Sequence, residues 1–444
     1  MSMGLDKFVW SRDVIELARQ LDSIRDEAKG EPFLARKAPS LADPNGGELY
    51  LLRRWNSHAP SIEDVEGGGY FFRWKNTGVV VDPGCGFLNQ FRKKTTYGPQ
   101  DIDLVAVTHD HLDHCQDFAA LVALLREVNK RGLRKREAGF PRTLDLILSH
   151  GVSAQFASVL THPDNAPFLR WTRVLPPREI AGPQRLPSIA ENDGGRPADL
   201  SAWGDGHLRA RMEFLGEPME KKYGFRLQAL PANHEELLGE KTALGLRFDF
   251  TSGPHPFSIV ISGDTGGGPA SPDAGGDNGF RSARELAQFY AGADLLILHV
   301  GTMEKVDATT GKPQREKFHL GLLGVVEILE ELAKISQEGH IELPKMVVLT
   351  EWGYEFSWGR AKRRSAFTQC VVEMLDKWGT AGRNKYCAAV GNAPPMTDKT
   401  PILPADLSLC IRLPDFHVRS EPSGAFVLPY SIRAHEDQNK IRYL

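Results

Sequence analysis

Short apolar runs recur along the central part of this chain and are separated by turn residues. They occupy residues 48–55, 70–74, 78–82, 104–107, 144–148, 226–230, 244–250, 258–262, 294–299 and 346–351. Runs of this length are typical of strands in a covered sheet. Apolar residues at helical spacing predict helices over residues 11–29, from His114 to about Lys130, over 320–335 and near 366–378. The alternation of the two patterns predicts an α/β protein.

The same pattern divides the chain into three parts. Residues 1–47 carry the first predicted helix and a linker rich in proline, glycine and alanine. Residues 48–359 hold the predicted strands, and a stretch rich in proline and glycine at about 176–222 interrupts their pattern and is interpreted as an insertion. Residues 360–444 form an extension with the last predicted helix and further strands. We therefore expect one main domain with an N-terminal helix and a C-terminal extension.

Composition limits the class of protein without assigning a function. Of the 444 residues, 41% are hydrophobic and 25% are charged, as in an ordinary globular protein, and the net charge of −3 provides no overall attraction for nucleic acid. The five cysteines are dispersed and form no Cys-x-x-Cys pair, which indicates a reducing compartment. The sequence shows neither a signal-peptide pattern nor the roughly 20 apolar residues of a membrane span. We expect a cytoplasmic protein that has no membrane partner.

The strongest chemical signal directly follows the apolar run at residues 104–107. His109, His111, Asp113 and His114 stand within six residues of one another. His109 and His111 are two apart, so they point the same way in an extended segment, whereas the next two ligand-type residues follow at the turn into a helix. Imidazole and carboxylate groups are ligands of divalent metals. This spacing favours two adjacent ions over one.

Other apolar runs end in residues of the same chemical kind. Asp82, His234, Asp264, His299 and Glu351 each stand at or just beyond the end of such a run. In open α/β sheets, functional groups collect beyond the carboxyl ends of the strands. The sequence therefore predicts that these residues and the histidine cluster share one site.

The His-x-His-x-Asp-His run resembles the signature of the metallo-β-lactamase superfamily, and the resemblance extends over about residues 48–355. It implies a four-layer αβ/βα sandwich, in which two sheets lie face to face and helices cover the outside. The resemblance also implies roles for single residues. His109, His111 and His234 would hold one ion, and Asp264 would bridge two ions.

By the same resemblance, Asp113 and His114 would begin the second metal site. Asp82 would orient the histidine loop, because a ligand histidine needs a partner on its other ring nitrogen. His299 is expected beside the ligands rather than among them.

The last third of the chain resembles the ribonuclease Z-like phosphodiesterases more closely. The similarity lies in residues 293–302, in His319 at the start of a predicted helix, and in the run that ends at Glu351. Two positions depart from that branch. Val300 stands where the branch has a glutamate that pairs with the catalytic histidine, and Glu351 stands where it has the final ligand histidine. The chain is therefore not expected to process the ends of transfer RNA.

The resemblance implies a hydrolase that uses two divalent ions and acts on a phosphodiester in a nucleotide or nucleic acid. Asp113 and His319 are the expected catalytic residues, with His319 as the general acid. Zinc is the expected metal, and the carboxylate of Glu351 as a ligand would favour manganese or iron in the second site.

Two other functions stay open at this point. The same metal pair could hydrolyse an acyl bond, such as a lactone or a thioester. Alternatively, the protein could be a metal-stabilised binding or sensor subunit with little turnover. Formation of a homodimer, or contact with partner proteins through the C-terminal extension, is also expected.

Overall fold

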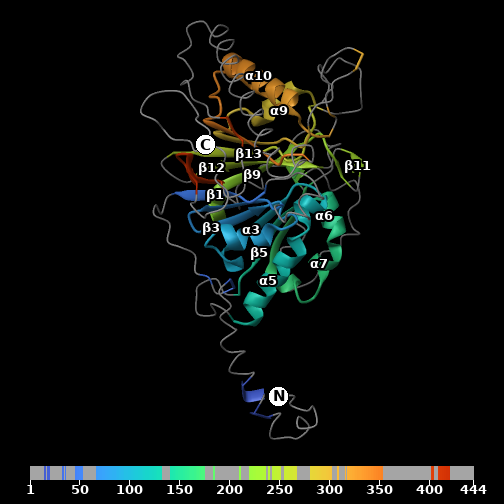
Figure 1. Ribbon diagram of the computed structural model, residues 1–444, viewed down its shortest axis with the longest axis vertical. Coiled ribbons are helices and arrows are strands. Elements are labelled where there is room, and N and C mark those ends of the chain that lie inside the picture. The colour runs from blue at the N-terminus through green and yellow to red at the C-terminus, as the bar shows by residue number, and fades with distance from the viewer. Residues whose placement is uncertain are drawn as a thin grey trace, which may run out of the picture.

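Two β-sheets lie face to face in the centre of the molecule, with helices on both outer sides (Figure 1). The computed structural model describes residues 46–53, 67–132, 141–175, 220–236, 243–251, 255–267, 281–302, 318–353, 402–404 and 409–420. It also describes the short pieces 15–16, 18–20, 33–34, 36, 184–185, 210–211, 239–240, 308–309 and 316. Of the predicted segments, the linker, the insertion and the N-terminal helix are described only in pieces, and the helix near 366–378 lies outside the described residues.

The first sheet has eight strands. Its neighbours β3, β4, β5 and β6 run parallel, whereas the strands on the other side of β3 pair antiparallel. In spatial order the strands are β18 (His417–Ser420), β17 (Leu409–Leu413), β1 (Gly47–Leu51), β2 (Tyr70–Trp74), β3 (Thr77–Val81), β4 (Leu104–Val107), β5 (Leu144–Ser149) and β6 (Leu169–Leu175).

The second sheet has six strands. β12 pairs antiparallel with both β9 and β13, and β13 to β16 run parallel, so β9 points the same way as β13. In spatial order the strands are β16 (Ile402–Pro404), β15 (Met346–Thr350), β14 (Leu295–His299), β13 (Phe257–Ile261), β12 (Leu244–Phe250) and β9 (Phe225–Pro231). Two small antiparallel pairs complete the strands: β7 (Gln184–Arg185) with β8 (Ala210–Arg211), and β10 (Glu235–Glu236) with β11 (Gly239–Glu240).

Helices cover the outer face of each sheet, as Figure 1 shows. The first sheet carries α3 (Phe87–Lys94), α4 (Leu112–Cys115), α5 (Phe118–Lys130), α6 (His150–Gln155) and α7 (Ala157–Thr161), with single 3₁₀ turns at η2 (Pro99–Asp101) and η3 (Ala166–Phe168). The second carries α9 (Ala283–Tyr290) and α10 (Leu322–Gly339). Separate apolar clusters join α3 and α5 to the first sheet and α9 and α10 to the second. The predicted four-layer sandwich is therefore confirmed.

The strand β2 shows how alternation along one strand builds two cores. Tyr70, Phe72 and Trp74 point into the cluster between the sheets, whereas Phe71 belongs to the cluster beneath the helices. Successive side chains of a strand point to opposite faces, so an unbroken apolar run serves both layers. The ring of Phe72 lies 5.0 Å from that of Phe248 in the opposite sheet. Aromatic contacts of this kind hold the two sheets together.

The predicted strands of both sheets are present, and several boundaries shift by a residue or two. The helix expected after His114 is divided into α4 and α5, because the single turn of α4 carries the ligand-type residues before the long helix begins. α3, α9 and β6 were not predicted. α9 begins with a capping box in which Ser282 and Glu285 bond each other's backbone N–H, a signal that the sequence does contain.

The end of the described chain contributes to both sheets. β16 pairs with β15, and β17 pairs with β1 over five residue pairs, including Leu49 with Ile411. Among the described residues, none of the helices is both long and apolar enough to cross a bilayer.

Replacing Phe72 with alanine tests the contact between the sheets. Phe72→Ala should lower the free energy of unfolding by about 3–5 kcal/mol, because it leaves a cavity between two sheets that cannot close on it. Urea denaturation followed by circular dichroism measures the loss. Ile15→Ala is the control, since Ile15 is 52% exposed and should change stability by no more than about 0.5 kcal/mol. Similar values for both variants would contradict the assignment of Phe72 to the core.

Candidate metal centre

Six strands that run in the same direction within their sheets deliver polar residues to one region of the molecule. The residues at or just beyond their ends are Asp82 (β3), His109 (β4), His234 (β9), Asp264 (β13), His299 (β14) and Glu351 (β15). All six side chains are almost completely buried. The predicted convergence of these residues is seen in the structure as four groups whose ligand atoms lie within 4.8 Å of one another.

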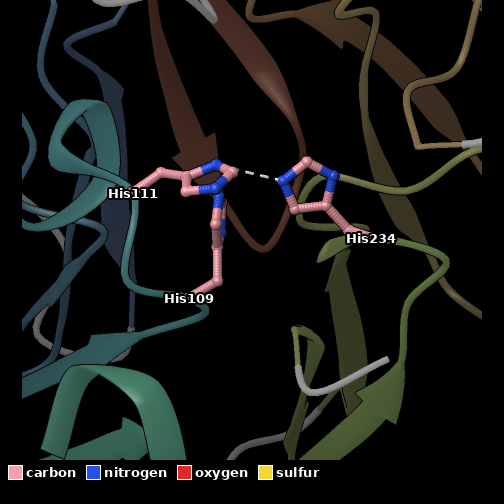
Figure 2. A group of neighbouring side chains, drawn as sticks. All are labelled: His109, His111 and His234. Atoms are coloured by element: carbon pink, nitrogen blue, oxygen red, sulfur yellow. Dashed lines mark hydrogen bonds between the residues drawn. The ribbon is translucent and has the colours of Figure 1, made fainter. Parts of the chain in front are cut away.

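The first group consists of His109, His111 and His234, whose rings face one another in Figure 2. Nδ1 of His111 lies 3.2 Å from Nε2 of His234. Two nitrogen ligands at 2.0–2.1 Å from a tetrahedral ion stand about 3.4 Å apart, so the spacing fits a shared metal ion. Nδ1 of His234 donates to the carbonyl oxygen of Phe318 at 2.8 Å, which leaves the lone pair of Nε2 pointing into the group.

Asp82 fixes the orientation of His109, through Thr108, and of a further histidine, His114. Its carboxylate accepts the backbone N–H and the hydroxyl of Thr108 at 2.7 and 2.8 Å. Because this hydroxyl gives its proton to Asp82, Nδ1 of His109 donates to the Thr108 oxygen at 3.1 Å. Nδ1 of His114 donates to Asp82 directly at 3.0 Å. In both rings Nε2 is buried and has no hydrogen-bond partner among the described residues, and in the neutral ring of His109 it keeps its lone pair.

The turn that carries Asp82 fits tightly against the histidine loop. A Cβ atom on Gly84 would lie 1.6 Å from the carbonyl oxygen of Asp113, so only glycine allows this approach. Asp82 itself has a φ of 51°, in the left-handed region that non-glycine residues rarely adopt. Backbone strain of this kind is concentrated at functional sites. The Asp-Pro-Gly sequence therefore reverses the chain and also holds Asp82 against the histidine loop.

Asp264 lies between the histidines. Its Oδ2 atom is 3.3 Å from Nε2 of His114, 3.8 Å from Nε2 of His109 and 3.9 Å from Nε2 of His234. Burial alone would raise the pKa of this carboxyl, but the charge of His114 and the hydrogen bonds of its neighbours hold it well below the ordinary value. An ionised carboxylate in this position suits the bridging role implied by the resemblance.

Around His114 three carboxylates form a second group of potential ligands. Its Nε2 lies 3.3 Å from Asp264, 3.6 Å from Glu351 and 3.8 Å from Asp113. Burial and a neighbouring arginine oppose a charge on this ring, but the carboxylates outweigh them and raise the pKa of His114 to about 10. The second group therefore favours a positive charge at this nitrogen, which a metal ion could supply instead of a proton.

The histidines of the first group have lowered pKa values, because burial outweighs the neighbouring carboxylate there. Burial lowers the pKa of His234 to about 3 and holds that of His109 well below its ordinary value, with the neighbouring histidines adding to the effect at His109. Neutral rings are the form in which imidazole binds a metal. The two groups thus differ in charge: the first offers neutral nitrogens, and the second offers mainly carboxylate oxygens.

Two residues that the sequence analysis missed complete the second group. Arg53, just after β1, is fully buried; it donates to Asp113 at 2.7 Å and lies 3.2 Å from Glu351. The hydroxyl of Tyr70 donates to the other carboxylate oxygen of Glu351 at 2.6 Å. A charged residue directly after a buried strand was the available signal for Arg53, and nothing in the sequence distinguished Tyr70 from the other aromatic residues of β2.

His299 lies beside these carboxylates. Its Nδ1 is 3.0 Å from Asp264 and 3.1 Å from Glu351, and its Nε2 is 2.9 Å from the hydroxyl of Tyr70. Because His299 also forms a potential ligand group with Asp264 and Glu351, its role as a residue that orients ligands stays a prediction. Glu351 itself points toward the group from a backbone with a φ of 57°. Val300, the other departure from the related branch, is completely buried in the apolar cluster beneath α9 and α10.

His319 is partly exposed, with 32% of its side chain accessible. Its Nδ1 lies 3.7 Å from Asp264, and its ring centre is 4.8 Å from that of His234. It stands just before α10, at the margin of the centre. Because it also forms a ligand group with His234 and Asp264, the geometry allows either proton transfer or metal binding.

Residues 77–158 match the family model of the beta-lactamase superfamily domain. The matched segment begins at β3 and includes His109, His111, Asp113 and His114. The predicted resemblance to the metallo-β-lactamase superfamily is thereby confirmed. No curated protein matches the sequence.

Several solved structures are similar to this chain at low identity. The short form of human tRNase Z is 13% identical, and the alignment covers 83% of this chain and 99% of that protein with a TM-score of 0.43. Yeast PDE1 is 12% identical, with coverages of 82% and 98% and a TM-score of 0.46. CmlA, a diiron β-hydroxylase from Streptomyces venezuelae, is 13% identical, with coverages of 84% and 54% and a TM-score of 0.38. At these values the likenesses assign no substrate to this chain.

Replacing Asp82 tests its role in holding the ligand histidines. Asp82→Asn should weaken metal binding by about 10- to 100-fold, because it weakens the hydrogen bonds that fix the ring orientation of His109 and His114. Titration of the metal-free protein with Zn²⁺ against a competing chelator measures the change. Asp145→Asn is the matched control, since Asp145 is also a buried strand aspartate but contacts Lys222 and Tyr223. Equal affinities of the two variants would show that Asp82 only shapes the turn.

Proposed function

We propose that this protein is a metal-dependent hydrolase that cleaves a phosphodiester bond in a nucleotide or nucleic acid. The observation that carries the proposal is the arrangement of donor atoms. Buried histidine nitrogens with their lone pairs turned inward surround Asp264, which lies between a nitrogen-rich and a carboxylate-rich group. Such a donor set has no role in packing, and two groups that share one carboxylate suit a pair of divalent ions.

Ions held in these two groups would supply an activated water near neutral pH and would neutralise negative charge on a phosphoryl oxygen. We assign zinc to the nitrogen-rich group and zinc, manganese or iron to the carboxylate-rich group, because hard oxygen ligands favour the latter two metals. In this assignment His109, His111 and His234 hold the first ion, and His114, Asp113 and Glu351 hold the second.

The chain's own residues supply the proton transfer. The leaving oxygen of a phosphodiester needs a proton, and His319 is the histidine at the accessible margin of the centre. A histidine can donate a proton near neutral pH without a large change in its pKa. Val300 stands where the related branch has the glutamate that pairs with the catalytic histidine. The orientation of the His319 ring therefore depends on other contacts.

The substrate class is proposed from the resemblance in the last third of the chain and from the two departures within it. The ribonuclease Z-like pattern of residues 293–302 favours a phosphodiester, and the changes at Val300 and Glu351 favour a substrate other than transfer RNA. We also propose that the protein works in the reducing environment of the cytoplasm. The cysteines are dispersed, and Cys85, Cys115 and Cys410 form no disulfide bond in the structure.

Removal of metal should abolish turnover. After treatment with a chelator, hydrolysis of bis(p-nitrophenyl) phosphate should fall to the level of buffer, and added Zn²⁺ or Mn²⁺ should restore it, because the ligand groups bind substrate only through the ions. His109→Ala should behave like the metal-free protein. His150→Ala is the control, since His150 begins α6 outside the ligand groups.

The comparison with acyl substrates decides between the remaining functions. Lactones and thioesters are tested as substrates beside linear and cyclic nucleotides. Cleavage of the lactones or thioesters alone would favour the acyl-hydrolase alternative. Stoichiometric metal without turnover of any of them would favour a binding or sensor subunit, which could contact a second copy or a partner protein through residues 360–444.

His319→Ala should lower turnover by about 10²- to 10⁴-fold, the usual contribution of a general acid, while the metal content stays unchanged. Elemental analysis and steady-state kinetics on the same preparation measure both quantities. His340→Ala is the control at the opposite end of α10. A loss of metal in His319→Ala would make His319 a ligand instead of the acid.

A further inference from the structure

Arg53 contacts two carboxylates of the second ligand group, and its position is explained by no catalytic role. Its side chain is completely buried, directly after β1. Two of its nitrogens contact two different carboxylates: NH2 lies 2.7 Å from Oδ2 of Asp113, and Nε lies 3.2 Å from Oε2 of Glu351. A buried arginine with this geometry is unlike a surface ion pair, because neither partner can turn to water instead.

The same oxygens face the second ligand group. Oδ2 of Asp113 and Oε2 of Glu351 are the atoms that lie 3.8 and 3.6 Å from Nε2 of His114. A carboxylate oxygen has two lone pairs, so one can accept from Arg53 while the other faces a metal ion. The guanidinium would then lie close to that ion at a fully buried position, where its charge is weakly screened.

The charges of the group indicate what Arg53 does there. When His114 binds a metal as a neutral ring, the formal charges of Asp113, Asp264 and Glu351 give the group three negative charges, and Arg53 reduces the sum to two. A histidine in place of Glu351, with no arginine, would give the same sum. Glu351 therefore adds a hard oxygen ligand without adding net charge, because Arg53 offsets its negative charge.

We propose that Arg53 is the counter-ion of Glu351 and sets the affinity of the second ligand group for its divalent ion. This proposal rests on the metal centre of the proposed function and not on its substrate. Arg53 and Glu351 act as one unit: the carboxylate offers the ligand atom, and the guanidinium keeps the group from binding any divalent cation too tightly. Arg53 contacts ligands and not the reacting atoms, so it is a positioning residue.

Substitutions that change the charge in steps test the proposal. Arg53→Met removes one positive charge, Glu351→Gln removes one negative charge, and the double variant restores the original sum. The affinity for the second ion should be highest in Arg53→Met and lowest in Glu351→Gln. The double variant should bind the second ion more tightly than Glu351→Gln, because the charge is restored, but less tightly than the wild type, because the carboxylate ligand is lost. Each step should change the dissociation constant by roughly tenfold or more, as expected for a unit charge so near a divalent ion.

The measurement is metal binding alone. The metal-free, full-length protein is titrated with Mn²⁺ at pH 8, and the electron paramagnetic resonance signal of free Mn²⁺ gives a dissociation constant for each ion. Binding of the first ion serves as the internal reference. Arg73→Met is the control, since Arg73 is a buried arginine on β2 that pairs with Asp101, and it should leave both constants unchanged.

Each outcome has a separate meaning. If Arg53 only held the loops in place, Arg53→Met would weaken the second ion, and the double variant would not recover; that result would overturn the proposal. If Arg53→Met does not fold, the comparison of Glu351→Gln with the double variant tests the same charge step. The proposal is then overturned if the double variant does not bind the second ion more tightly than Glu351→Gln. Failure of all variants and the wild type to bind any ion would reject the metal centre itself. Metal binding in the expected order without phosphodiester hydrolysis would reject only the proposed substrate.

Discussion

Buried negative charge is the constraint on which the arrangement of this centre depends. Asp82, Asp113, Asp264 and Glu351 are at most 3% exposed and lie close together. An isolated carboxylate in such surroundings is strongly destabilised unless positive charge or hydrogen bonds compensate it. The histidines, Arg53, Tyr70 and the backbone of the histidine loop provide part of that compensation. A cluster of this kind is stable only as a unit, which explains why residues from both sheets meet at one place.

The fold and most of the site could be predicted because their signals are local in sequence. A short apolar run predicts a strand, and the residue that follows it lies at the carboxyl end of that strand. His109, His234 and Asp264 were found in this way, and the structure brings them together. The helix α9 was missed because it is short, although its capping residues Ser282 and Glu285 mark its start.

The missed residues of the site depend on contacts between distant segments. Arg53 meets Asp113 across 60 positions and Tyr70 meets Glu351 across 281 positions of the sequence. One sequence does not show that an arginine after one strand lies against a glutamate after another. The compensation of the Glu351 carboxylate by Arg53 could not be predicted for the same reason, because the arginine comes from a separate part of the chain.

The pairing of β1 with β17 links the end of the chain to the centre. β1 positions Arg53, and it is held between β2 and a strand, β17, that follows Glu351 by more than fifty positions. A fragment that stopped after the last ligand would contain every residue proposed to bind metal, yet it would leave β1 as an unprotected edge that can pair with other chains. Trimming this protein to its recognisable motif would thus change its solubility and its metal chemistry together.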